Sequence, residues 1–238
     1  MPALRVPRRF TRFPIALPLR HQIEGRSADK PENGWTRDLS GGGACVELAA
    51  RLQLDMPLRL VIRMDQNSIE VVSRVIWRGD PPRVEGGTRY GIAFRHLPPD
   101  QLETLGNFLL SLRQWRHARG RLPSNLAVTC RLIRFSDPPI PGKLGNVSRG
   151  GIMLRLPVEL PPSTDLEVSL SSPRRTLTLA ATIAWVESRE RRKSLRAIQH
   201  GVRFPRLDWS ASLALAHMLT DQPDGPQPPR PTMAQSLL

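Results

Sequence analysis

The chain has 238 residues, of which 39% are hydrophobic, and this length suits two domains of about 110 residues with a modest core each. The formal net charge of +14 favours an anionic partner such as a nucleotide, a nucleic acid or a membrane surface, although the basic residues are nearly all arginine, a bias that genome base composition alone can produce. The two cysteines match no disulfide or metal-ligand pattern, and no signal peptide or membrane-spanning run is found, so we expect a cytoplasmic protein without a metal site.

The first predicted element is a basic arm over residues 1–13. Apolar and polar side chains then alternate at period two in four segments: 58–63, 69–77, 166–170 and 176–185. This alternation predicts half-buried antiparallel strands, and short strands between Gly, Pro and Asp clusters favour a small barrel or sandwich. The alternation also includes Trp77 and Trp185, which we expect in the core or at a barrel rim and not as base-stacking platforms.

Helical spacing follows each group of strands. Leucines at 102, 105, 109 and 112 come after Asp100, a predicted N-cap, and the apolar residues of a second helix begin after Ser210, the other predicted cap. The polar segments 78–88 and 187–198 are predicted to be exposed loops, with the arginines of the second loop forming a solvated face. The Pro- and Gln-rich residues 222–238 read as a disordered tail.

The two halves of the chain repeat the same landmarks in the same order. Asp38-Leu39-Ser40-Gly41-Gly42-Gly43 returns as Asn146-Val147-Ser148-Arg149-Gly150-Gly151, both of the form [Asp/Asn]-x-Ser-x-x-Gly, at an offset of 108 residues. Trp77 returns as Trp185 at the same offset, and the Gly-x-x-Phe that begins at Gly91 returns at Gly201. A repeat of this length predicts two copies of one domain, each with its own core.

The first copy also carries Arg-x-x-x-Arg at Arg8 and Arg12, about 26 residues before Asp38. This pair, followed by Asp-x-Ser-x-x-Gly at a strand start, resembles the PilZ domain, and the resemblance covers nearly the whole chain. It implies an all-β fold: two tandem six-stranded antiparallel β-barrels, each followed by a C-terminal α-helix. It also implies a receptor for the bacterial second messenger cyclic di-GMP, with contacts from a set of residues in the first copy: Arg8, Arg9, Arg12, Asp38, Ser40 and Gly43.

The residue types suit that ligand. An arginine fork can donate to O6 and N7 of guanine, and a guanidinium plane can stack on a purine face. A carboxylate such as Asp38 can accept from guanine N1–H and N2–H, and glycines let backbone N–H groups approach a phosphate. Taken singly, each of these residues is better explained by a turn or a solvated tail. Their joint order and spacing reverse that preference for the first copy and favour a site.

The second copy departs from the pattern. His117 stands where the first arginine of the pair is expected, and Arg116 and Arg119 lie out of register. Histidine lacks the guanidinium fork and is mostly neutral at pH 7, so ligand binding by this copy is the weaker expectation. The residues of a possible second site are His117, Arg121, Asn146, Ser148 and Gly151.

The predicted organisation has four parts: a first domain over 1–112, a basic bridge over 113–121, a second domain over 117–221 and a tail over 222–238. We expect a cyclic di-GMP effector that regulates a downstream protein, with no cofactor, no specific nucleic-acid partner and no enzymatic activity, since the common catalytic motifs are missing from the sequence. Three alternatives remain open. The chain could be a ligand-free interaction module, a non-specific nucleic-acid binder with steep salt dependence, or a receptor in which both domains bind.

Overall fold

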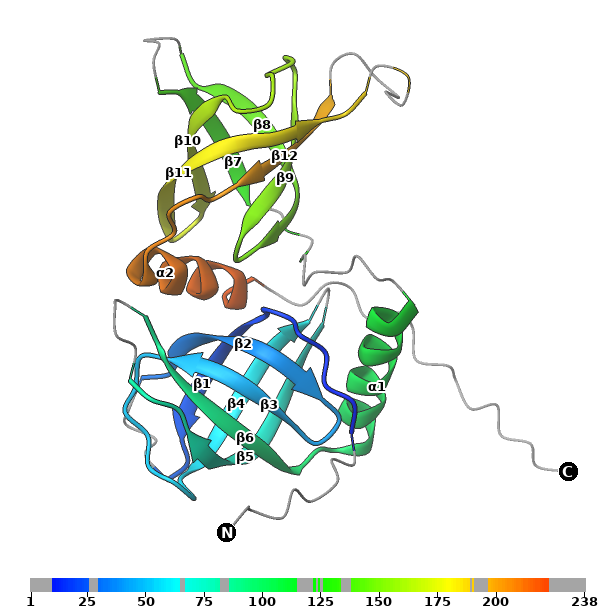
Figure 1. The fold of residues 1–238 in the computed structure, drawn as a ribbon, viewed down its shortest axis with the longest axis vertical. Coiled ribbons are helices and arrows are strands. Elements are labelled where there is room, and N and C mark those ends of the chain that lie inside the picture. Colours follow the sequence, from blue (N-terminus) through cyan, green and yellow to red (C-terminus); the bar gives the residue numbers. More distant parts are fainter. Residues whose placement is uncertain are drawn as a thin grey trace, which may run out of the picture.

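The chain folds into two closed barrels, shown by a computed structural model of the protein (Figure 1). The structure describes residues 10–25, 30–64, 67–81, 86–114, 122, 124, 126–133, 138–188, 190 and 197–222. The first barrel comprises β1 (Pro18–Ile23), β2 (Glu32–Ser40), β3 (Gly43–Leu48), β4 (Pro57–Met64), β5 (Asn67–Arg78) and β6 (Thr88–His96), followed by α1 (Pro99–Gln114). The second comprises β7 (Ala127–Leu132), β8 (Ile140–Ser148), β9 (Gly151–Leu156), β10 (Asp165–Ser172), β11 (Arg175–Val186) and β12 (Ile198–Arg203), followed by α2 (Trp209–Thr220).

The strand order confirms both the predicted fold class and the repeat. Neighbouring strands run β1-β2-β3-β6-β5-β4 in the first barrel, and the second barrel has the same circle with β7 in the place of β1. All pairings are antiparallel, so each strand turns one set of alternate side chains inward. On β4 these inward residues are Leu58, Leu60 and Ile62, all fully buried, as the period-two pattern predicts.

The two copies also agree in their backbone detail. Phe13 pairs with Leu39 through two hydrogen bonds, and Leu122 pairs with Val147 in the same way. Outside glycine, positive φ angles among the described residues occur only at Asp55 (61°) and Ser163 (68°), which are related by the repeat offset. Such matched special conformations indicate one domain design used twice.

We expected Trp77 and Trp185 in the core or at a barrel rim, and neither of them lies in the core. The register of β5 against β6 shifts between Val75 and Trp77, and β11 against β12 shifts at the equivalent place. A bulge inserts an extra residue, so the side chains after it change face. Trp77 and Trp185 therefore lie on the outer surface, 38% and 41% exposed, each ring against a glycine of the neighbouring strand.

Both predicted helices exist, but both predicted caps are wrong. α1 begins at Pro99, so Asp100 lies inside its first turn, where a carboxylate favours the helix dipole. α2 is capped by Asp208, whose carboxylate accepts a 2.7 Å hydrogen bond from the Ala211 N–H, and Ser210 is already helical. In α1 the first helical residue, Pro99, comes one position before the predicted cap, because proline is favoured in the first turn. In α2 the cap, Asp208, comes two positions before the predicted one, because aspartate is favoured at that position.

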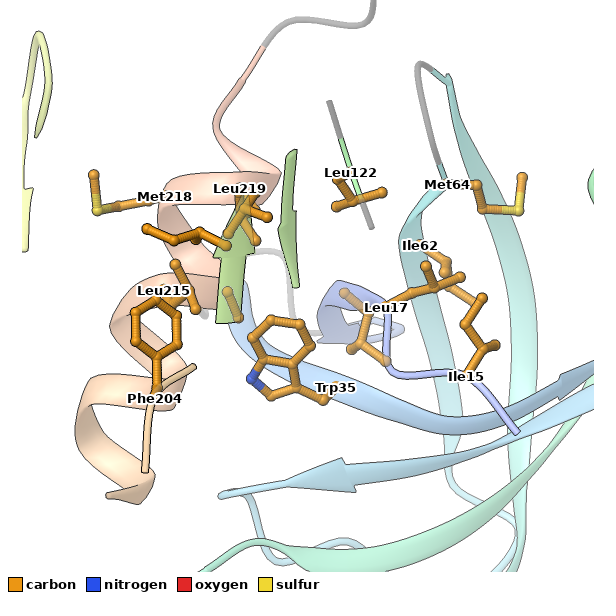
Figure 2. Close-up of a cluster of buried hydrophobic side chains, with 14 of the residues drawn as sticks. Ile15, Leu17, Trp35, Ile62, Met64, Leu122, Phe204, Leu215, Met218 and Leu219 are labelled. Atoms are coloured by element: carbon orange, nitrogen blue, oxygen red, sulfur yellow. The ribbon is translucent and has the colours of Figure 1, made fainter. Parts of the chain in front are cut away.

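Helix α2 lies between the two barrels (Figure 1). It contacts β1, β2 and β4 of the first barrel as well as β11 of the second. Figure 2 shows Leu215, Met218 and Leu219 of this helix beside Trp35 of β2, whose indole N–H donates a 3.0 Å hydrogen bond to the Ser212 carbonyl. The second copy's C-terminal helix therefore joins the domains through a shared apolar core.

Several predictions fall outside the described residues. They concern the arm up to Arg9, the bridge over 115–121, parts of the two polar loops (82–85, 189 and 191–196) and the tail from 223 onward. No helix in the described part of the chain is both long and apolar enough to span a membrane.

Candidate functional site

The first motif lies on the β2–β3 hairpin, and the chain before β1 runs beside it. Phe13 N–H donates to the Leu39 carbonyl and Ile15 N–H to the Arg37 carbonyl, which holds the segment against β2. This pairing places Arg12 next to Asp38, although 26 residues separate them. The structure thus brings together one residue of the predicted arginine pair and the acidic residue of the motif.

The contact between Arg12 and Asp38 is direct. Arg12 Nη1 donates to Asp38 Oδ1 at 2.9 Å, and the Cys45 N–H donates to the same oxygen at 3.1 Å. Both side chains are 28% exposed, so the pair lies at the surface where a ligand can reach it. A charge-assisted hydrogen bond of this kind orients the guanidinium and the carboxylate toward each other.

Ser40 and Gly43 build the turn itself. Ser40 Oγ donates a 2.9 Å hydrogen bond to the Gly43 carbonyl, and Ser40 is only 4% exposed. A Cβ at Gly43 would collide with the carbonyl oxygen of Ile92 on β6, so the position admits only glycine without a backbone shift. The structure thus shows Ser40 and Gly43 in a structural role, while Arg12 and Asp38 face outward.

Phe10 covers the turn, a contact that sequence reasoning missed. A Cβ on Gly42 would meet the Phe10 ring at 2.8 Å, and one on Gly41 would meet it at 3.2 Å. The ring is 48% exposed and therefore forms part of the surface beside the motif. The only signal in the sequence was an aromatic residue between the two arginines, next to a turn of glycines that leave room for a ring.

A buried carboxylate behind the hairpin links the two barrels. Glu47 of β3 accepts from Arg149 Nη1 at 2.8 Å, and Arg37 Nη1 lies 3.7 Å from the same oxygen, Oε2. The Arg149 guanidinium also lies over the rings of Trp35 (5.8 Å) and Trp209 (5.4 Å). Sequence reasoning missed this cluster, because Arg149 occupies an unspecified position of the second motif and Glu47 lies 102 residues away.

The environment of Cys45, the cysteine of the hairpin, disfavours the reactive thiolate form. Burial raises the pKa of the Cys45 thiol, and the negative charge of Asp38 raises it further. The thiol therefore stays protonated at neutral pH, since a reactive cysteine needs its pKa lowered.

The second motif repeats the first turn. Ser148 Oγ donates to the Gly151 carbonyl at 3.0 Å, and a Cβ at Gly151 would collide with the Val202 carbonyl. Asn146 occupies the place of Asp38 on β8. His117 and Arg121, the remaining residues of the possible second site, lie outside the described residues.

A pocket of about 620 Å³ lies between the barrels, on the face that carries the second motif. The first barrel contributes residues 14–16 and Arg37, and the second contributes residues 148–153, Ala184, Trp185 and residues 201–203. Asp38 and Arg12 do not line it. The two copies of the motif therefore have different surroundings: the second motif faces another domain across a cavity.

Comparisons with known proteins point to one family. A family model for the PilZ domain matches the sequence twice, over residues 7–111 and 114–220. Among solved structures, the chain is similar to the PilZ domain of CeSA from a cellulose-synthesizing bacterium, at 22% identity and a TM-score of 0.35, over 43% of this chain and 98% of that one. It is also similar to the PilZ domain of YcgR with c-di-GMP from Escherichia coli, at 17% identity and a TM-score of 0.39, over 46% of this chain and 93% of that one.

A third similar structure extends over most of the chain. It is the PlzA protein of Borreliella burgdorferi in complex with c-di-GMP, at 12% identity and a TM-score of 0.35, over 86% of this chain and 87% of that one. No curated protein sequence matches the chain.

Proposed function

The chain belongs to the PilZ domain family, and we propose that it is a receptor for cyclic di-GMP whose first barrel holds the ligand. The observation that carries the proposal is the contact of Arg12 with Asp38 at the motif hairpin. Arg12, one arginine of the family's pair, meets the acidic motif residue there on an accessible surface.

The chemistry of the surface matches a dianionic purine ligand. Arg12 keeps further N–H donors for a phosphate or for guanine O6 and N7, and Asp38 can accept from guanine N1–H and N2–H. The ring of Phe10, beside the turn, offers an apolar face for a base. We assign Arg8 and Arg9 to the same site by the spacing of the family motif.

Titration calorimetry with cyclic di-GMP tests the proposal. Arg12→Ala and Arg8→Ala should each weaken binding about tenfold or more, because each removes charge-assisted hydrogen bonds to the ligand. Arg59→Ala is the matched control: Arg59 also donates to a carboxylate, Glu70, at 2.8 Å, but on β4, which pairs with neither strand of the hairpin. Equal losses in all three variants would show diffuse electrostatics in place of a site.

We also propose how binding is transmitted. Ligand held by Arg8 and Arg12 draws the part of the N-terminal arm before Phe10 against the β2–β3 hairpin, and the changed surface regulates a partner protein of a process such as motility or exopolysaccharide production. Hydrogen exchange measured with and without cyclic di-GMP should then show slower exchange over residues 1–9. Unchanged exchange in that segment at saturating ligand would contradict the transmission step while leaving the receptor proposal intact.

A further inference from the structure

We propose that the outer side of helix α1 pairs with the same side of a second copy of the chain, so that two chains form an antiparallel helix dimer. Four residues that helical spacing brings to one side make up this outer stripe: Leu102, Gly106, Leu109 and Leu110. The proposal does not depend on cyclic di-GMP, because no residue of the proposed ligand site lies on α1.

Helix α1 has two apolar sides, and it packs only one of them closely against its own barrel. Leu105, Phe108 and Leu112, spaced by three and four residues, lie on the side that packs toward β5. Leu102 and Leu110 of the outer stripe are 52% and 56% exposed, and the helix lies on the outside of the first barrel (Figure 1). A row of exposed leucines along one helix is a patch of the kind that marks an interaction surface.

The second copy shows what this side of the helix does when it has a partner. At the 110-residue offset that relates Gly91 to Gly201, the outer stripe corresponds to four residues of α2: Ser212, Ala216, Leu219 and Thr220. The Ser212 carbonyl accepts from the Trp35 indole, and Thr220 Oγ1 donates to Asn33 Oδ1 at 3.0 Å, both on β2 of the first barrel. The equivalent side of α2 is therefore a docking surface, and each helix packs on the equivalent strand of its own barrel, β5 or β11.

The surfaces of the chain itself narrow the choice of partner for the outer stripe. The end of the first barrel around Trp35 is already covered by α2. The corresponding end of the second barrel is polar where the first is apolar, because Lys143 stands at the repeat position of Trp35 and Ser172 at that of Met64. The outer stripe of a second copy is apolar and has the same length, and a surface that pairs with itself closes into a two-fold dimer.

The charges of α1 favour the antiparallel direction. Glu103 lies beside the outer stripe near the start of the helix, and Arg113 continues the stripe in its last turn. An antiparallel pair brings Glu103 of one copy toward Arg113 of the other, whereas a parallel pair places like charges together. With the two-fold axis at Gly106, Leu102 lies opposite Leu110, since each is four residues from the axis. A Cβ on Gly106 would meet no atom within 4 Å in its own chain, so this side is open for a close approach.

The contact is short, so the dimer should be weak. The helix has 16 residues, and each copy contributes only one side of it. An interface of this extent falls at the small end of specific protein interfaces, so we expect a dissociation constant of about 100 μM.

Sedimentation equilibrium of the full chain, at concentrations on either side of about 100 μM, tests the pairing. Leu110→Glu should weaken the dimer about tenfold or more, because it places a carboxylate in the apolar contact. Ile133→Glu is the matched control, since Ile133 is also 56% exposed but follows β7 on the second barrel. Thermal unfolding followed by circular dichroism confirms that each variant folds.

A charge exchange tests the direction of the two helices. Glu103→Arg and Arg113→Glu should each weaken the dimer several-fold by placing like charges together, and the double variant should recover most of the wild-type affinity. The double change opposes the helix dipole, so recovery cannot come from a more stable helix.

Four results would overturn the proposal. The wild type could stay monomeric throughout the concentration series. Leu110→Glu could weaken a dimer no more than Ile133→Glu does, which would place the interface elsewhere. The double charge variant could fail to recover, which would exclude the antiparallel pairing. A chain lacking residues 223–238 could dimerise where the full chain does not, which would assign the outer stripe to the C-terminal tail.

Discussion

At the residue scale, the two motif turns depend on glycine for steric reasons. Gly43 and Gly151 each lie against a backbone carbonyl of the next strand, whereas a Cβ on Gly150 would meet nothing within 4 Å. Two adjacent glycines of one turn therefore have different requirements, which the sequence pattern alone does not separate. The structure explains why the last glycine of Asp-x-Ser-x-x-Gly belongs to the motif.

This difference gives a paired prediction. Gly151→Ala should lower the free energy of unfolding by about 1–3 kcal/mol, because the β9–β12 pairing must shift to admit the methyl group. Gly150→Ala should change it by less than about 0.5 kcal/mol. Urea denaturation of both variants measures the two values, and similar losses would mean that close backbone approach is not the constraint.

His21 is a second residue whose environment has a measurable consequence. It lies on β1 with 3% of its surface exposed, and neither ring nitrogen has a hydrogen-bond partner among the described residues. Burial lowers the pKa of His21 from 6.5 to about 4, because the charged ring would lose its hydration. The folded state thus holds a neutral ring at pH values where the unfolded chain is protonated.

The sign of the pH dependence follows. Between about pH 6.5 and pH 4 the unfolded state binds more protons, so stability falls as the pH is lowered through this window. His21 should make the protein about 2 kcal/mol less stable at pH 5 than at pH 7.5. His21→Leu should lose that part of the pH dependence in urea denaturation, and His96→Leu, at an exposed position, should keep it. An unchanged pH slope in His21→Leu would refute the assignment.

At the element scale, the strands were predictable and their ends were not. Period-two alternation follows from strand geometry, so it located the inward-facing residues of β4 and β10 directly. The bulges before Trp77 and Trp185 depend on pairing with a distant strand, and no local signal revealed them. The helix caps were misplaced because Pro99 and Asp208 compete with Asp100 and Ser210 within two residues.

Helix α2 follows the second barrel in the chain, and we expect it to stabilise the first barrel as much as the second. Leu215 is fully buried in the interdomain cluster, whereas Leu102 of α1 is 52% exposed. Leu215→Ala should therefore lower the unfolding free energy by about 2–5 kcal/mol, and Leu102→Ala by about 0.5 kcal/mol or less.

Differential scanning calorimetry can follow both barrels in these two variants. If Leu215→Ala lowered the melting temperature of the second barrel alone, the helix would not belong to a shared core. A similar shift in Leu102→Ala would show that burial between the barrels is not what stabilises the protein.

At the scale of the whole molecule, the arrangement of the domains is the part that sequence reasoning could not reach. The repeat predicted two barrels, and the resemblance led us to expect Arg12 and Asp38 at one ligand site. The contacts of Arg149 with Glu47 and of Trp35 with Ser212 join residues 102 and 177 positions apart, and no periodicity encodes them. An unspecified position of the second motif thus holds the domains together.

The Arg149–Glu47 pair should couple the two barrels energetically. Both side chains are mostly buried, at 23% and 11% exposed, so Arg149→Ala leaves Glu47, among the residues that the structure describes, with only the longer contact to Arg37. A double-mutant cycle with Glu47→Gln, followed by urea denaturation, should give a coupling energy of about 1–3 kcal/mol. Arg131→Ala, on β7 and outside this cluster, should show no coupling to Glu47→Gln.

Small-angle scattering gives an independent measure of the same contact. Arg149→Ala should increase the radius of gyration, since the variant loses a contact between the barrels that α2 and the polar contacts at its end, such as Arg20 with Asp221 at 2.6 Å, do not replace. High salt should raise the radius of gyration of the wild type only part of the way to that of the variant, because salt screens a buried ion pair less than an exposed one. A coupling energy near zero together with an unchanged radius would show that the second motif's arginine does not hold the domains in place.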